Sequence, residues 1–130
     1  MVISAVTRLT ADGEAPGAAR RFVTATLREH AARLPFSDVL TVLSELATNA
    51  VQAGAAVIDV HLDSEAAFTR IAVTDDAAGW PTPRRPGPND VSGRGLMIVE
   101  ALTTRWGVTP TSGPAQGKEV WAVLAHPTRS

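Results

Sequence analysis

The sequence predicts an α+β fold, a two-layer α/β sandwich with helices on one face of a mixed, mostly antiparallel sheet. Strand-like and helix-like patterns follow one another in the order strand, helix, helix, strand, strand, long loop, helix, strand, strand, so most strands pair as hairpins. The chain has 130 residues, of which 45% are hydrophobic and 19% are charged. That is the size and balance of one globular domain, so residues 1–130 are expected to form a single core.

A strand and a helix begin the predicted order. β-Branched residues predict a short strand over residues 2–9, and Asp12-Gly13 then predicts a turn. Pro16 suits the first turn of a helix, which apolar residues at helical spacing extend over residues 17–33. We expect this helix to end at Leu34-Pro35, because the residue before a proline disfavours helical backbone.

The second helix has its own start and stop signals. Ser37 is a preferred N-cap residue and Gly54 is the expected stop, which together predict a helix over residues 38–53. Its apolar residues recur at i, i+3, i+4 and i+7 and form a single stripe, consisting of Val39, Val42, Leu43, Leu46 and Ala50. This stripe is expected to face the core.

Two strands are expected after this helix, over residues 57–63 and 68–75. The first alternates cleanly between apolar and polar side chains, and the second does so less cleanly. The side chains predicted on the buried faces are Ile58, Val60 and Leu62 in the first strand and Ile71, Val73 and Asp75 in the second. An aspartate is therefore expected on the buried face at the point where the second strand ends.

Residues 76–93 show no periodicity and hold four prolines and three glycines. Loops of this length are usually functional lids or linkers, so a lid is expected here. A helix over residues 94–106 and two strands over residues 106–112 and 117–125 complete the predicted order.

Charge and cysteine content narrow the function classes. Twelve basic and thirteen acidic residues leave a net charge of -1, so no basic footprint marks a direct nucleic-acid partner. The chain has no cysteine, which excludes disulfides and thiolate chemistry. Without a signal pattern or a long apolar run, the chain is expected to be cytoplasmic and to have no membrane contact.

Lys118 is the only lysine in the chain. A P-loop places its lysine after a run of glycines, whereas Lys118 follows only Gly117 near the last predicted strand. If the chain binds phosphate, the binding groups are therefore expected to be mainly arginine side chains or backbone N–H groups.

Three features indicate a ligand site. Glu45 and Asn49 lie one helical turn apart at the border of the apolar stripe, where they can face a pocket. Asp75 ends a strand, and Gly93-Arg94-Gly95 opens a helix whose bare N–H groups favour phosphate. Taken singly, each has an ordinary explanation as a solvated helix edge, a turn residue or a loop terminus. Their order along the chain predicts a nucleotide site.

Four segments also match the motifs of a known family. The matching segments are Ser44-Glu45-Leu46-Ala47-Thr48-Asn49-Ala50-Val51, Asp75-Asp76-Ala77-Ala78-Gly79, Gly93-Arg94-Gly95-Leu96 and Gly117-Lys118-Glu119-Val120-Trp121. In this order they resemble the N box and the first, second and third glycine boxes of the GHKL ATPases, which share the Bergerat ATP-binding fold. Over residues 15–125 the chain is most similar to the small stand-alone members, the anti-sigma factor serine/threonine kinases of actinobacterial type.

The resemblance implies a role for each matching residue. Glu45 would be the general base of phosphoryl transfer, and Asn49 would hold Mg²⁺ through its side-chain oxygen. Asp75 would accept a hydrogen bond from the exocyclic amine of adenine, and Gly79 would let the backbone pass beside the base. The phosphates of ATP would be bound under a lid at about 76–93 by the second glycine box, which supplies Gly93, Arg94, Gly95 and Leu96. Ala77 and Glu119 depart from the usual residues of the first and third boxes.

The resemblance further implies an ATP-binding anti-sigma factor with serine/threonine protein kinase activity and with ATP and Mg²⁺ as cofactors. Such a protein sequesters a sigma factor and phosphorylates a small anti-sigma-factor antagonist, and relatives commonly form homodimers. Two alternatives stay open: a non-catalytic, ATP-dependent interaction module, and a detached histidine-kinase-like ATPase domain that phosphorylates a partner's histidine. A third alternative is a folded domain of this family that no longer binds a nucleotide.

Overall fold

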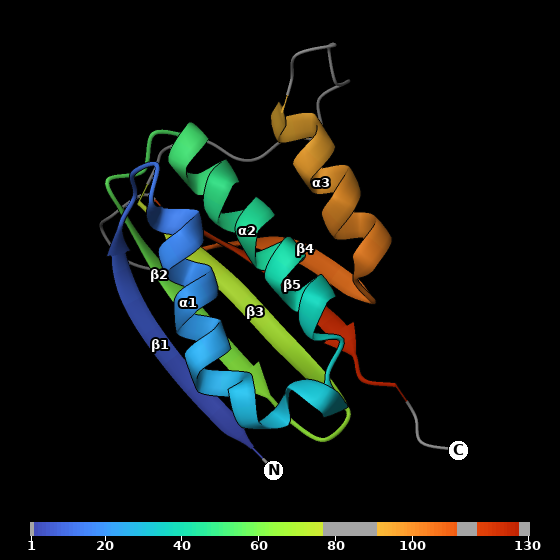
Figure 1. The fold of residues 1–130 in the computed structure, drawn as a ribbon. Coiled ribbons are helices and arrows are strands. Elements are labelled where there is room, and N and C mark those ends of the chain that lie inside the picture. The colour runs from blue at the N-terminus through green and yellow to red at the C-terminus, as the bar shows by residue number, and fades with distance from the viewer. Residues whose placement is uncertain (1, 77–90, 112–116, 128–130) are drawn as a thin grey trace.

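The structure is a two-layer sandwich in which helices cover one face of an antiparallel sheet (Figure 1). The computed structural model describes residues 2–76, 91–111 and 117–127, and leaves out the side chains of residues 31–33 and 91–95. The described elements are β1 (Ile3–Thr10), α1 (Ala15–Leu27), the 3₁₀ helix η1 (Arg28–Arg33), α2 (Phe36–Gln52), β2 (Val57–Ser64), β3 (Phe68–Asp75), α3 (Val91–Leu102), β4 (Arg105–Pro110) and β5 (Lys118–Ala125). The predicted α+β class is confirmed.

The described strands form one sheet in the order β1-β2-β3-β5-β4, and every neighbouring pair is antiparallel. The predicted inward side chains of β2 are fully buried, and those of β3 lie opposite them in register. The register continues across the sheet at the end of β3, where Asp75 pairs with Ile58 on one side and with Lys118 on the other. The other face of the sheet carries the ion pairs of Arg8 with Asp59 and of Arg70 with Glu119.

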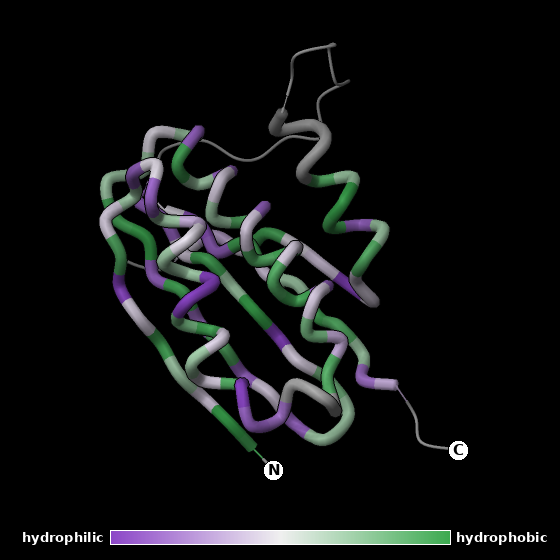
Figure 2. The backbone as a smooth tube through the Cα atoms, viewed as in Figure 1, coloured by the Kyte–Doolittle hydropathy of each residue, from purple (hydrophilic) through white to green (hydrophobic). Residues whose placement is uncertain are grey.

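Helix α2 lies at the centre of the helical layer and packs against α1, α3, β3 and β5. Its predicted apolar stripe is buried, together with Ala47. Figure 2 shows the hydrophobic middle of β3 between α1 and α2, and α2 packs against this strand. Helix α2 contacts both the sheet and α3. Residues at the border of its apolar stripe therefore lie near the junction of the helical layer and the sheet. Among the described residues, no helix has the length and apolar character needed to cross a bilayer.

Several helix boundaries differ from the prediction. The predicted helix over residues 17–33 is α-helical only to Leu27 and tightens into η1, a common way for a helix to end before a proline. Ser37 is not the N-cap of α2: Pro35 occupies that position, and its carbonyl oxygen accepts a hydrogen bond from the N–H of Val39 at 2.9 Å. The stop at Gly54 is as predicted, since its φ of 89° is the left-handed conformation that glycine tolerates.

Helix α3 also begins and ends earlier than predicted, at residues 91 and 102. The hydroxyl of Thr103 bonds back to the carbonyl oxygen of Val99, and the N–H of Thr104 donates to the carbonyl oxygen of Val123 in β5. The first bond ends helix α3, and the second joins the following residues to β5 in the sheet. Trp106, expected on the helix, therefore lies in β4 and packs partly buried against the core.

Candidate functional site

Three of the predicted site residues, Glu45, Asn49 and Asp75, lie on elements that meet toward one end of the sandwich. The last turns of α2, the end of β3 and the start of β5 lie at this end, and α3 begins in the same upper part of the molecule (Figure 1). The side chains of Glu45, Asn49 and Asp75 project from α2 and β3, two elements that pack against each other. The geometry thus brings the predicted N-box residues and the strand-end aspartate into one region.

The side-chain amide of Asn49 is buried and has no hydrogen-bond partner within the part of the chain that the structure describes. Both its Oδ1 and its Nδ2 atom are inaccessible to solvent, and neither has a hydrogen-bond partner among the described residues. A buried polar group left unsatisfied costs about 1–3 kcal/mol, so the core alone does not explain an asparagine at this position. The amide oxygen is a good ligand for a hard cation such as Mg²⁺.

Glu45 lies one helical turn before Asn49 and is half-buried. Burial removes water from its carboxylate and raises the pKa of Glu45 above its ordinary value. A carboxylate with a raised pKa is a stronger proton acceptor than one in water. The position and the pKa shift of Glu45 both suit a general base.

Asp75 and Lys118 form a buried ion pair that the sequence reasoning missed. The Nζ atom of Lys118 lies 3.0 Å from Oδ1 of Asp75, and the two side chains are only 4% and 1% exposed, respectively. A usable signal was present: the strand alternation that buries Val120 and Leu124 also places Lys118 on the inner face. The chain's only lysine is thus held beside the strand-end aspartate.

Neighbouring residues fix the end of β3. The Oδ1 atom of Asp76 accepts hydrogen bonds from the N–H groups of Ala56 at 2.9 Å and Val57 at 3.4 Å, and these bonds lower the pKa of Asp76. On the other side, Gly117 approaches the carbonyl oxygen of Asp75 so closely that a Cβ atom at Gly117 would overlap it. The end of β3 is therefore flanked on one side by the hydrogen bonds of Asp76 and on the other by the close approach of Gly117.

The predicted phosphate-binding residues are described only in part. Gly93, Arg94 and Gly95 lie within the first turns of α3 and do not precede it, because the helix begins at Val91. Their side chains lie outside the described residues, as do Gly79 and nearly all of the predicted lid. Leu96 is 5% exposed, so its side chain belongs to the core.

The segment resembling the third glycine box divides between the two faces of the sheet. Lys118 points inward, whereas Glu119 lies on the outer face and pairs with Arg70 at 2.7 Å. The guanidinium of Arg70 also lies over the ring of Trp121, 5.7 Å from its centroid. The departure at Glu119 therefore has a structural role away from the candidate site.

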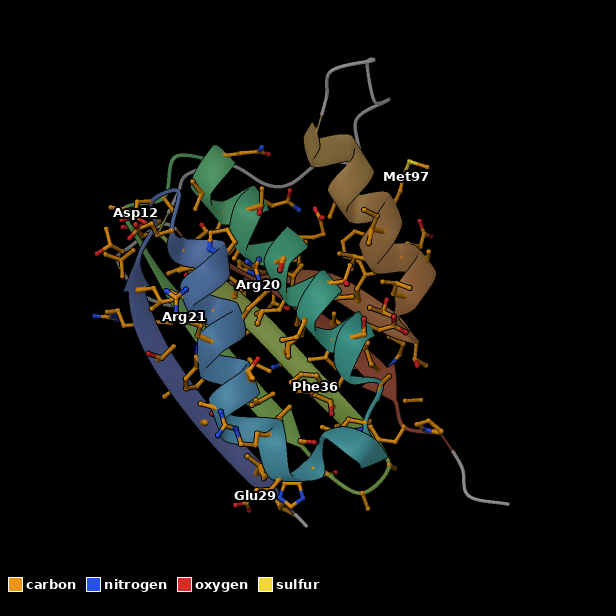
Figure 3. The ribbon with its side chains drawn as sticks, viewed as in Figure 1. Asp12, Arg20, Arg21, Glu29, Phe36 and Met97 are labelled. Atoms are coloured by element: carbon orange, nitrogen blue, oxygen red, sulfur yellow. The ribbon has the colours of Figure 1, made fainter. Side chains whose placement is uncertain are left out.

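A separate shallow hollow lies over α1 and α2 and is lined by Gly17, Arg20, Arg21, Thr24, Ala25, Arg28 and Leu40. Figure 3 labels Arg20 and Arg21 on α1, and Arg20 donates a hydrogen bond to the hydroxyl of Ser44 at 3.0 Å. None of the candidate site residues lines this hollow. It is a different surface from the site that Asn49 and Asp75 mark.

Comparisons with known proteins agree with the fold and with the ATPase family. A sequence profile described as "Histidine kinase-like ATPase domain" matches residues 9–124. Among solved structures, a chain described as "Mycobacterial sensor histidine kinase MprB" has a TM-score of 0.52 at 13% sequence identity. That match covers 92% of this chain and 98% of the other, and at such low identity it is a likeness of fold. A search of curated proteins found no match.

Proposed function

The chain belongs to the family of histidine kinase-like ATPase domains, which implies that it binds ATP, and we propose that it acts as an anti-sigma factor with serine/threonine protein kinase activity. In this proposal the protein sequesters a sigma factor in the cytoplasm and phosphorylates a hydroxyl group of a small anti-sigma-factor antagonist. The motif resemblance of the N box and the second glycine box supports this subgroup.

The buried side-chain amide of Asn49, which has no hydrogen-bond partner among the described residues, is the observation that carries the proposal. A ligand that bound at this amide would supply the missing partner. Asn49 would hold Mg²⁺, which would neutralise the phosphate charge of ATP and take its remaining ligands from phosphate oxygens and water. The donor set fits, because Mg²⁺ usually takes few protein ligands and prefers oxygen.

The other residues divide between the base and the phosphates. Asp75 would accept a hydrogen bond from the exocyclic amine of adenine at the buried end of β3. The backbone N–H groups at the start of α3, over Gly93, Arg94 and Gly95, would face the phosphates, since the first N–H groups of a helix have no intrahelical partner.

Glu45 would supply the proton acceptor. A serine or threonine hydroxyl of the partner attacks the γ-phosphorus of ATP, the bond from this phosphorus to the β–γ bridging oxygen breaks, and ADP leaves. The hydroxyl proton passes to the carboxylate of Glu45, whose raised pKa suits this task. A domain that only binds nucleotide has no need of an acid at this position.

The test is incubation of the full chain with labelled ATP, Mg²⁺ and antagonist-type proteins of the same organism. We expect transfer of label to a serine or threonine, in a bond that survives acid. Glu45→Ala should reduce the transfer rate by roughly 100-fold or more, the usual contribution of a general base. Glu100→Ala removes an exposed glutamate of α3 and should leave the rate unchanged.

Three outcomes would overturn the proposal. Transfer that is equal in the wild type and in Glu45→Ala would remove the catalytic role of Glu45. ATP binding without any transfer would favour a non-catalytic interaction module, and an acid-labile phosphoryl bond would favour transfer to histidine.

A further inference from the structure

The buried pair of Asp75 and Lys118 has no explanation in the stability of the fold. Lysine is rarely buried fully, and then only with a partner. An apolar pair of similar volume usually stabilises a core at least as well as an ion pair, because both charges must lose their water. Yet the chain places its only lysine here, 3% exposed, on the inner face of β5.

The position of the pair indicates a ligand. Asp75 and Lys118 are opposite each other in the β3–β5 register, at the end of the sheet near which α2 ends (Figure 1). Asn49 lies in the last turn of α2, and its amide has no hydrogen-bond partner among the described residues. The ammonium lies 3.0 Å from Oδ1 of Asp75. A carboxylate has about four lone-pair sites, so it can accept hydrogen bonds besides the one from the ammonium.

We propose that Lys118 is the positioning residue for base recognition: its ammonium holds the buried Asp75 carboxylate in the orientation of an acceptor for the 6-amino group of a purine. Without the ammonium, the carboxylate would lose the 3.0 Å bond that fixes its Oδ1 atom, and it would turn away from the base. A carboxylate in another orientation makes a poorer hydrogen bond to the 6-amino group, so the preference for a 6-aminopurine would fall.

Lys118 therefore contributes to recognition of the base through Asp75, and it does not bind the phosphates. This inference rests on the proposed binding of ATP with its base at Asp75. It concerns which group of the nucleotide is selected, and it is independent of whether Glu45 transfers a phosphoryl group.

The first experiment compares two nucleotides that differ at one group. Dissociation constants are measured by calorimetry with Mg²⁺ for ATP and for purine riboside triphosphate, which lacks the 6-amino group. A hydrogen bond to a charged group contributes enough that the wild type should prefer ATP by about 10-fold or more. In Lys118→Met, the ratio of the two dissociation constants should be close to one. If Lys118 had a purely structural role, the substitution would weaken the binding of both nucleotides by the same factor.

Glu119→Gln is the matched control. It breaks an ion pair between the same two strands, that of Glu119 with Arg70, but on the opposite face of the sheet. The preference for ATP should survive in this variant. Equal loss of the preference for ATP in Glu119→Gln and Lys118→Met would overturn the inference. It would mean that any weakening of the β3–β5 pairing is enough to abolish the preference.

A second measurement needs no substitution and decides the matter if Lys118→Met does not fold. Because Lys118 is the only lysine, protein labelled with ¹⁵N-lysine gives a single side-chain ammonium signal in NMR spectra. ATP at saturation should shift this signal, and the analogue without the 6-amino group should shift it clearly less. Equal shifts with both nucleotides would overturn the role of Lys118.

The outcomes separate the two proposals. A wild type that binds neither nucleotide contradicts the proposed function itself. A wild type that prefers ATP, combined with a Lys118→Met variant that keeps the full preference, contradicts only the role of Lys118.

Discussion

Glu45 and Asn49 both lower the stability of the free protein. The amide of Asn49 is buried without a partner among the described residues, and the carboxylate of Glu45 has lost part of its water. Neither cost is offset by another described contact of these groups. Residues that a fold tolerates at a cost are expected at sites where a ligand or a reaction uses them.

The partial burial of the Glu45 carboxylate predicts that the protein becomes less stable as the pH rises. Burial raises the pKa of Glu45 in the folded protein, so the folded state binds this proton more tightly than the unfolded chain does. The free energy of unfolding therefore falls as pH rises through the unfolded and folded pKa values of Glu45. Glu45→Gln should be more stable than the wild type at neutral pH.

Denaturant unfolding across a pH series measures this effect. The difference in unfolding free energy between Glu45→Gln and the wild type should be positive at neutral pH. It should vanish below pH ~4, where the glutamate is protonated in both states. A variant less stable than the wild type at neutral pH would show that the carboxylate makes a stabilising contact.

The sequence predicted the faces of individual residues better than their partners. The stripe in α2 placed Glu45 and Asn49 at its border, and strand alternation placed Asp75 inward. The bond from Lys118 to Asp75 joins residues 43 positions apart, and such a bond depends on which strands are neighbours in the sheet. Local patterns contain no information about that order.

At the scale of elements, the end of β3 depends on the close approach of β5. A Cβ atom at Gly117 would overlap the carbonyl oxygen of Asp75 and would lie 3.0 Å from Oγ1 of Thr111. Gly117→Ala should therefore separate the two chain segments at the site. We expect a loss of about 1–3 kcal/mol in unfolding free energy, the usual cost of overpacking, together with weaker ATP binding.

Gly13→Ala is the control for this substitution. A Cβ atom at Gly13 would meet nothing within 4 Å, and the backbone there is not left-handed. Thermal unfolding and ATP titration of both variants give the comparison. If Gly117→Ala bound ATP as tightly as the wild type, the spacing between Gly117 and Asp75 would not shape the site.

Element boundaries were predicted less well than element types. Each expected strand and helix within the described residues is present, because periodicity extends over many residues. The ends depend on single bonds instead: Pro35 replaces Ser37 at the start of α2, and Thr103 and Thr104 end α3 before Trp106. These bonds involve tertiary neighbours or backbone geometry, which a local pattern does not reveal.

At the scale of the whole molecule, the two ends of β3 serve different purposes. The end opposite the site holds a chain of polar side chains: Ser64 bonds Thr69 at 3.0 Å, and Thr69 bonds Nε2 of His126 at 2.7 Å. The imidazole also contacts the carbonyl oxygen of Ala66 through Nδ1. This chain fastens the segment after β5 to the β2–β3 hairpin and is structural.

Thr69→Val tests the division of purposes. Valine keeps the shape of threonine but leaves the fully buried hydroxyl of Ser64 without its partner, so the unfolding free energy should fall by about 1–3 kcal/mol. ATP affinity should be unchanged, because the site lies at the other end of β3. Thr109→Val, which removes an exposed hydroxyl that Trp121 contacts, should cost less. A clear loss of ATP affinity in Thr69→Val would show that the two ends are coupled.

The amide of Asn49 tests the account most directly, by calorimetric titration of the full chain with ATP and Mg²⁺. We predict that the wild type binds and that Asn49→Leu loses at least about tenfold in affinity, equivalent to about 1.4 kcal/mol, without any fall in its unfolding midpoint. Thr41→Ala, an exposed position on the same helix, should bind as the wild type does. No heat with the wild type, or equal affinity in Asn49→Leu, would contradict the assignment of this end of the sandwich as the ATP site.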